Sequence, residues 1–136
     1  MATVGQEATR TLTVDGSMLK AYAEITGDYN PLHFDEAFAA ATRFKRLIAQ
    51  GGIVTGLLHA LVAMDLPGPG SVFVRQTWKF PKPVFVGDTI TARGVVTAAP
   101  RRSMYEMEFE ATNQDGDVVL EGEGLLYQAG PSGKRD

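Results

Sequence analysis

The segment at residues 53–64, Ile-Val-Thr-Gly-Leu-Leu-His-Ala-Leu-Val-Ala-Met, restricts the possible folds of this 136-residue chain more than any other feature. As a helix it would be apolar on every side except at Thr55 and His59, so it has no polar face to turn toward water. A membrane span takes about 20 residues, which is more than this segment offers. The sequence therefore predicts a buried helix over residues 53–65, covered on most sides by a sheet.

The rest of the chain supplies the strands that such a sheet needs. Apolar and β-branched runs predict strands at residues 71–80, 88–99, 103–112 and 117–128, and a threonine-rich run predicts a first strand at 8–14. Residues 103–112 alternate apolar side chains with glutamates, which is typical of a strand with one buried face. The sequence Asn-Gln-Asp-Gly at 113–116 predicts a hairpin turn between the last two strands.

The region between the first strand and the apolar helix predicts two smaller helices. Asp15 is a typical N-cap for a helix over residues 17–26, and Gly27 is a typical stop. Pro31 disfavours helical geometry in the residue before it, so the segment around it is predicted to be a bent, non-helical loop. Asp35 is positioned to cap a short helix that follows.

This order of elements predicts an α+β hot-dog fold, in which a curved antiparallel sheet wraps around a central apolar helix. Residues 1–136 are expected to form a single domain, with residues 129–136 as a frayed tail. An open sheet leaves edge strands that must be covered or paired. We therefore expect a homodimer.

Charge and cysteine content exclude several classes of function. The net charge of −3 lacks the basic excess that nucleic-acid binding requires. The absence of cysteine excludes disulfides, thiolate metal sites and a cysteine nucleophile, and it fits a cytoplasmic location. The N-terminus has no apolar stretch typical of a signal peptide, and no membrane segment is predicted. Because His33 and Asp35 have no clear further ligands, we expect no metal site.

Asp28 and His33 are the strongest candidates for catalysis. They lie five residues apart in the bent segment, where a carboxylate and an imidazole can face one cavity and move protons to and from one water. A structural interpretation is also open at this point: Asp28 can form an Asx turn, and His33 can be an ordinary surface residue.

Gly51 and Gly52 precede the apolar helix and form the second candidate feature. Unpaired backbone N–H groups at a helix N-terminus favour negative charge, and glycine lets a substrate carbonyl approach the backbone closely. The alternative is a loop in which these glycines are needed for positive φ angles.

These residues together resemble the signature of the MaoC-like (R)-specific enoyl-CoA hydratase and dehydratase family. The resemblance covers approximately residues 10–128, and its motifs occur in the family's order. They are Asp28-x-Asn30-Pro31-x-His33-x-Asp35, Ile48-Ala49-Gln50-Gly51, Leu66-Pro67-Gly68-x-Gly70-Ser71 and Pro83-Val84-Phe85-Val86-Gly87-Asp88.

The resemblance implies a hot-dog homodimer that takes acyl-CoA thioesters in a tunnel near the dimer interface and needs no cofactor beyond the CoA of the substrate. It implies that Asp28 and His33 hold a water that adds to C3 of a trans-2-enoyl thioester, with a proton delivered to C2 on the same face. The Gly51 N–H would hold the thioester oxygen as enolate charge develops. Asn30 would orient the loop or the water.

Two residues depart from the family pattern at positions where the resemblance implies contact with substrate. Gln50 stands where many members carry histidine, and we expect it to alter the polarity of the pocket without loss of the chemistry. His59 stands where short-chain hydratases carry a serine, which affects the expected acyl-chain preference. A core histidine with a hydrogen-bond partner is the alternative interpretation of His59.

A basic cluster at Arg43, Lys45 and Arg46 precedes the candidate site. It fits either contact with CoA phosphates or a solvated turn. Two other functions stay open from the sequence: a hot-dog acyl-CoA thioesterase, which would release free CoA, and a non-catalytic acyl-CoA-binding domain.

Overall fold

The computed structural model describes residues 2–130, which form one five-stranded antiparallel sheet and four helices. The elements are β1 (Glu7–Thr13), α1 (Gly16–Thr26), α2 (Pro31–Phe34), α3 (Glu36–Ala40), α4 (Gly51–Met64), β2 (Ser71–Lys79), β3 (Thr89–Arg101), β4 (Met104–Thr112) and β5 (Val118–Gln128). The strand order is β1-β3-β4-β5-β2, so β1 and β2 are the two edges. Of the predicted tail, residues 131–136 lie outside the described residues.

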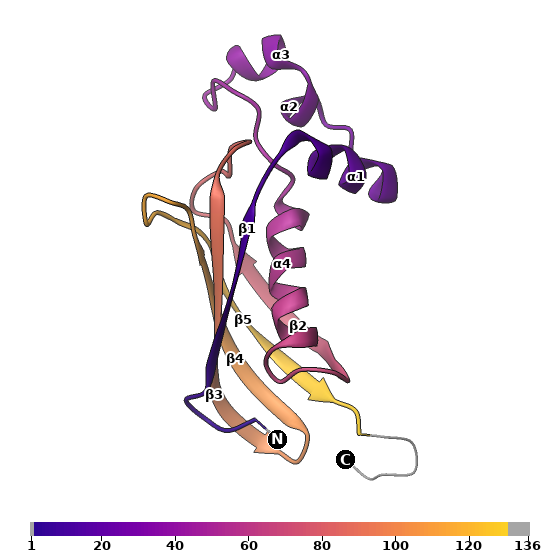
Figure 1. Cartoon of the computed structure of the whole chain (residues 1–136), viewed down its shortest axis with the longest axis vertical. Helices are drawn as coiled ribbons and strands as arrows, with labels where there is room; N and C mark the ends of the chain where they lie inside the picture. The colour runs from indigo at the N-terminus through magenta and orange to yellow at the C-terminus, as the bar shows by residue number, and fades with distance from the viewer. Residues whose placement is uncertain (1, 131–136) are drawn as a thin grey trace.

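The sheet curves around α4, and α1, α2 and α3 lie together at one end of the molecule (Figure 1). Along β4 the apolar side chains Met107, Phe109 and Ala111 are buried, while Glu108 and Glu110 between them are exposed. The period-two pattern thus places one face of the sheet on the core. The predicted α+β fold, with a curved antiparallel sheet and a central apolar helix, is confirmed.

Helix α4 begins at Gly51, two positions earlier than predicted, and the sheet covers only one of its faces. Gly56, His59 and Met64 of α4 are exposed in the single chain, and of these His59 still contacts the sheet through Phe73 of β2. The prediction that α4 is covered on most sides is therefore wrong for one chain, because a five-stranded sheet curves around one side of a helix only. The buried side chains of α4 are Val54, Leu58, Leu61 and Val62.

The predicted boundaries of α1 are confirmed by its caps. The Asp15 carboxylate accepts a hydrogen bond from the Met18 N–H at 3.1 Å, and Gly27 ends the helix in the left-handed conformation with φ 82°. The Ser17 hydroxyl and the Met18 N–H both donate to this carboxylate and hold the pKa of Asp15 below its ordinary value.

The prediction of a non-helical segment at Pro31 is wrong. Pro31 is the first residue of the short helix α2, and the Asn30 side chain caps that helix by accepting from the Leu32 N–H at 3.1 Å. Proline is tolerated at this position because the first helical N–H has no intrahelical partner. The expected restriction acts one residue earlier, since Asn30 has φ −51° and ψ 128°, outside the helical region.

Between residues 2 and 130, no helix is both long enough and apolar enough to cross a membrane.

Candidate active site

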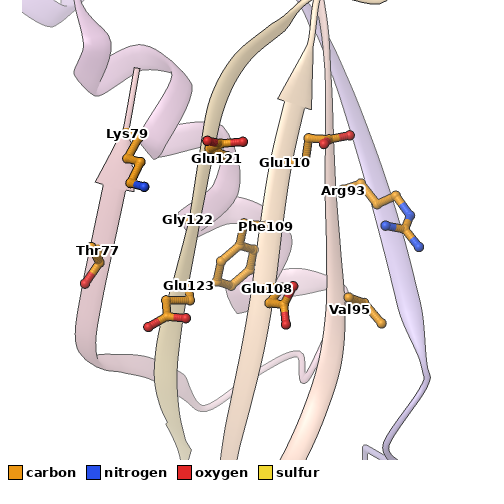
Figure 2. A pocket seen from close by; sticks show the side chains of 10 residues that line it. All are labelled: Thr77, Lys79, Arg93, Val95, Glu108, Phe109, Glu110, Glu121, Gly122 and Glu123. Atoms are coloured by element: carbon orange, nitrogen blue, oxygen red, sulfur yellow. The ribbon is translucent and has the colours of Figure 1, made fainter. Parts of the chain in front are cut away.

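Two hollows in the surface of residues 2–130 are compared as candidate sites. The larger, about 530 Å³, lies on the face turned away from α4, and the carboxylates of β4 and β5 line it together with Lys79 and Arg93 (Figure 2). It contains none of the residues predicted to carry chemistry. We therefore place no active site there, although this hollow has the greater volume.

The second hollow, about 380 Å³, contains three of the predicted site residues: Asn30, His33 and Gly51. Apolar side chains form most of its wall, and Arg43 and Lys82 add two positive charges to the lining. A mostly apolar cavity with a few convergent polar groups is typical of a small-molecule site. The apolar lining residues include Leu32, Ile48, Val54, Phe80, Val84 and Val119.

His33 is buried in α2, and a backbone carbonyl fixes its orientation. Its Nδ1 lies 2.6 Å from the carbonyl oxygen of Ile48. Because a carbonyl oxygen only accepts, Nδ1 carries the hydrogen, and in the neutral ring Nε2 keeps its lone pair. The interpretation of His33 as a surface residue is therefore wrong.

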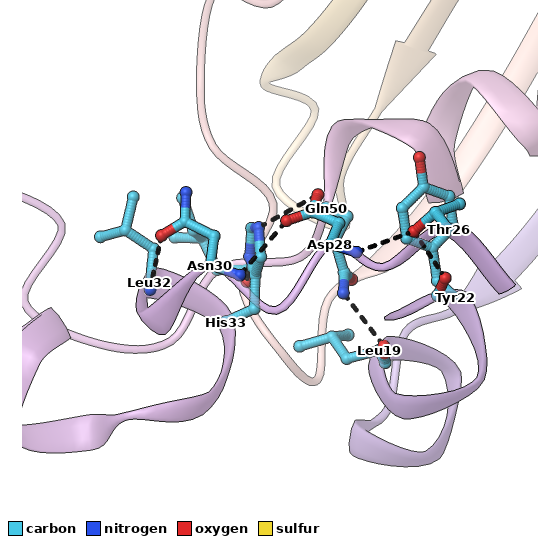
Figure 3. Close-up of polar contacts among 9 residues, drawn as sticks. Leu19, Tyr22, Thr26, Asp28, Asn30, Leu32, His33 and Gln50 are labelled. Carbon is cyan, nitrogen blue, oxygen red and sulfur yellow. Dashed lines mark hydrogen bonds and ion pairs between the residues drawn. The ribbon is translucent and has the colours of Figure 1, made fainter. Parts of the chain in front are cut away.

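The lone pair of His33 faces Asp28, which follows the end of α1 (Figure 3). Nε2 and the Asp28 Oδ2 are 3.9 Å apart, too far for a direct hydrogen bond. The other oxygen, Oδ1, accepts from the Asn30 N–H at 3.3 Å and so forms the Asx turn that was the structural interpretation of Asp28. The turn and the pairing with His33 occur together, because each uses a different carboxylate oxygen.

Gly51 starts α4, and its backbone N–H has no hydrogen-bond partner within residues 2–130. Neither Gly51 nor Gly52 has a positive φ angle, so the alternative that these glycines serve loop conformation is wrong. Close packing explains them instead: a Cβ on Gly51 would lie 3.1 Å from the Phe80 ring, and a Cβ on Gly52 would collide with Tyr22.

Of the predicted substrate-binding residues, Asn30 lines the cavity and Gln50 does not. The Asn30 side chain lines the cavity while its oxygen caps α2. Gln50 is fully buried behind Gly51, and its Nε2 donates to the Leu19 carbonyl at 3.0 Å.

His59 lies on the exposed face of α4, so its interpretation as a core histidine is wrong. It does have a hydrogen-bond partner: its Nε2 is 3.0 Å from Gln76 Oε1, which also accepts from the Trp78 Nε1–H at 2.6 Å. Because that oxygen can only accept, His59 donates to it. The ring also packs against Phe73, with centroids 4.5 Å apart.

The basic cluster divides between the cavity and the outer surface. Arg43 lines the cavity, and the Arg46 guanidinium lies 3.9 Å from the centroid of the Phe85 ring. Lys45 is exposed, with a positive φ of 69°. Across residues 2–130, no group of three or more histidine, aspartate or glutamate side chains is placed to hold a metal ion.

Comparison with known proteins places the chain in a family. A family sequence profile described as "MaoC like domain" matches residues 2–117. The chain belongs to this MaoC-like family. The resemblance inferred from the motifs around Asp28, His33 and Gly51 is thereby confirmed.

Two named relatives within the family show how far the similarity extends. The chain is 36% identical over 124 residues to the (R)-specific enoyl-CoA hydratase of Aeromonas caviae, across 90% of this chain and 92% of that protein. It is 40% identical over 114 residues to the 3-hydroxybutyryl-CoA dehydratase of Methylorubrum extorquens, across 83% of this chain and 72% of that protein. The solved structure of the (R)-hydratase from A. caviae involved in PHA biosynthesis superposes with a TM-score of 0.89 at 35% identity, covering 94% and 98% of the two chains.

Sequence reasoning missed two contributors to this MaoC-like site. The Ile48 carbonyl selects the His33 tautomer, and a backbone carbonyl leaves no signal in a sequence. Lys82 enters the cavity from the segment after β2. Its neighbours Pro81 and Pro83 indicate a rigid loop, but only the fold brings that loop beside α2.

Proposed function

We propose that the protein adds water reversibly to trans-2-enoyl-CoA thioesters and forms (R)-3-hydroxyacyl-CoA, as a hydro-lyase. The observation that carries this proposal is the pairing of Asp28 Oδ2 with a His33 Nε2 whose lone pair faces it at 3.9 Å. A water about 2.8 Å from each atom would subtend about 90° between them, close to the angle between its own two O–H bonds. One water can therefore donate to both acceptors.

In the forward direction, this water loses a proton to the dyad as its oxygen bonds to C3 of the enoyl group. The electron pair of the C2=C3 bond moves toward C2 and the thioester carbonyl, which becomes an enolate. The free N–H of Gly51 stabilises that oxygen, because the donor is already oriented before charge develops. The dyad then returns its proton to C2, the carbonyl re-forms, and the net change is the addition of one water.

The cavity wall suits a thioester carried by CoA. Its apolar residues fit the pantetheine and acyl parts, and Arg43 and Lys82 supply positive charge for phosphate groups. CoA thus enters as part of the substrate, and the proposal includes no separate cofactor. It also places the protein in the cytoplasm, which the absence of cysteine favours.

The deciding experiment measures loss of the enoyl group, the configuration of the alcohol formed, and release of free thiol in one assay. We expect purified protein to decrease the enoyl absorbance of crotonyl-CoA and of longer trans-2-enoyl-CoAs, and to form the 3R alcohol, with no release of free thiol. Thiol release at the rate of substrate loss would instead indicate a thioesterase. Binding of enoyl-CoA without turnover would indicate a non-catalytic acyl-CoA-binding domain. A series of chain lengths also measures the preference that His59 is expected to influence.

The working form in this proposal is a homodimer joined along β2. Of the two edge strands, β1 carries mainly threonine and charged side chains, whereas β2 exposes Val72 and Val74 at 56% and 57%. Met64 of α4 is also exposed in the single chain, at 61%. An exposed apolar edge strand readily pairs with another chain, and a second copy would cover these side chains.

We expect light scattering at micromolar concentration to give twice the chain mass of 14.7 kDa. The double substitution Val72→Lys and Val74→Lys should shift the protein to the mass of one chain, because charged side chains on an edge strand oppose pairing. A wild-type mass of one chain would contradict the dimer, and an unchanged dimer in the lysine variant would contradict the assignment of its interface to β2.

A further inference from the structure

We infer that Gln50 is a positioning residue, whose buried carboxamide uses helix α1 to hold the Gly51 N–H in place relative to Asp28. This inference rests on the proposed function. It concerns a side chain next to Gly51 whose buried amide oxygen has no hydrogen-bond partner within residues 2–130.

Gln50 is only 1% exposed, and within residues 2–130 the only other buried polar or charged side chains are His33 and Asp88. Its Nε2 donates to the Leu19 carbonyl, which fixes the orientation of the amide. Its Oε1 is buried and has no hydrogen-bond partner in the part of the chain that the structure describes. Half of the amide is therefore satisfied, and half is not.

Such a residue is a poor choice for stability alone. The Oε1 atom gives up hydrogen bonds to water and receives none in return, whereas an unbranched apolar side chain of similar length would fill the same space without that cost. Departures from full polar satisfaction are expected at functional sites, where geometry matters more than stability. Gln50 directly precedes the proposed enolate donor, so a role in geometry follows from its place in the chain.

The amide connects the two elements that build the site. Helix α1 contains Leu19 and ends at Gly27, directly before Asp28, while Gln50 leads directly into Gly51. The Gln50–Leu19 hydrogen bond therefore joins the element that delivers the carboxylate to the element that delivers the N–H (Figure 3).

A second contact with α1 lies on the other side of Gly51. The Tyr22 ring and hydroxyl pack so closely on Gly52 that a Cβ there would collide with them. Helix α4 has no side-chain N-cap, so its first turn is not anchored in the usual way. Contacts with α1 on both sides of Gly51 anchor the first turn of α4 instead. The contact at Gly52 is van der Waals packing, whereas the contact at Gln50 is a hydrogen bond.

The test is Gln50→Met, which keeps length and volume and removes the hydrogen bond together with the unsatisfied oxygen. We expect a kcat for crotonyl-CoA hydration about ten-fold lower, since a misplacement of about 1 Å at a reacting centre can cost roughly 100-fold. KM should stay within about two-fold, because the loss affects the transition state more than substrate binding. The melting temperature should be equal to that of the wild type or higher.

Gln128→Met is the matched control. The Gln128 Nε2 donates to the carbonyls of Pro67 and Pro69 at 3.1 and 3.2 Å, in the turn that follows the far end of α4. The same substitution there should lower the melting temperature and leave kcat per folded molecule unchanged. Gln50→Met is thus expected to lower kcat without lowering the melting temperature, and Gln128→Met to lower the melting temperature without lowering kcat.

A folded Gln50→Met protein with a kcat within about two-fold of the wild type would overturn the inference. A clear fall in melting temperature would also overturn it, because Gln50 would then be a stabilising residue. If Gln50→Met does not accumulate as folded protein, Gln50→Leu is measured in its place. If neither variant folds, Gln50 is a stabilising residue and the inference is overturned. Wild type and Asp28→Asn are assayed alongside: an inactive wild type refutes the proposed function, whereas an active wild type matched by Gln50→Met refutes only the positioning role.

Discussion

Asp28→Asn and His33→Ala are each expected to lower kcat for enoyl-CoA hydration by about 10²–10⁴-fold, the usual worth of one positioned proton-transfer group. The asparagine variant keeps the size of the side chain, and its oxygen can still accept from the Asn30 N–H, but it loses the charge and basicity that face His33. The alanine variant removes the Nε2 lone pair that the Ile48 carbonyl orients. Steady-state rates with crotonyl-CoA, scaled to folded protein by circular dichroism, measure both effects.

The double variant should be little slower than the slower single variant, because two groups that act on one water lose their function as a unit. Asp65→Asn is a matched control, since Asp65 lies at the opposite end of α4 and pairs with Arg10 at 2.6 Å. It should keep the wild-type kcat. If the two dyad variants are folded and hydrate enoyl-CoA at near wild-type rates, the mechanism is wrong. A lower melting temperature with full turnover would assign both residues a structural role.

Gly51→Pro is expected to lower kcat by about 10²–10³-fold, the typical cost of removing one donor to a developing oxyanion. The substitution suits this position, because Gly51 is the first residue of α4 and proline is tolerated there. The residue before it, Gln50, already has φ −62° and ψ 135°, which a following proline favours. The helix can therefore form while the N–H is absent.

Gly51→Ala separates the loss of the donor from the added bulk. It keeps the N–H and introduces the same Cβ, 3.1 Å from the half-exposed Phe80 ring, which can move by the small amount required. We expect this variant to retain most of the activity. A folded proline variant with near-normal turnover would exclude the Gly51 N–H as the enolate donor, and equal losses in both variants would attribute the effect to crowding at Phe80.

Local pattern was sufficient to predict most of the fold. The caps of α1, the alternating β4 and the turn before β5 are all set by neighbours within a few residues, and each prediction was confirmed within one or two positions. The two errors have a physical cause that local pattern does not contain. Pro31 begins a helix because Asn30 caps it, and α4 keeps an open face because the sheet of one chain curves around one side only.

The residue types of the candidate site were evident from the sequence, since Asp28, His33 and Gly51 stand in motifs that resemble one family. The distances between these residues and the tautomer of His33 could not be predicted from the sequence. Three separate elements bring these residues together: the turn after α1, helix α2, and the N-terminus of α4. The His33 tautomer depends on the carbonyl of Ile48, 15 residues away, and the burial of Gln50 depends on α1.

The sequence by itself therefore determined which elements form and which side chains could carry chemistry, because hydrophobic periodicity, capping and turn preferences act over short stretches of chain. Only the tertiary structure decided how Asp28 and His33 face each other, that His33 and Gly51 line the same hollow, and that His59 is exposed instead of lying in the core. Those outcomes depend on long-range packing and on backbone hydrogen-bond partners, and every residue has the same backbone N–H and C=O apart from proline.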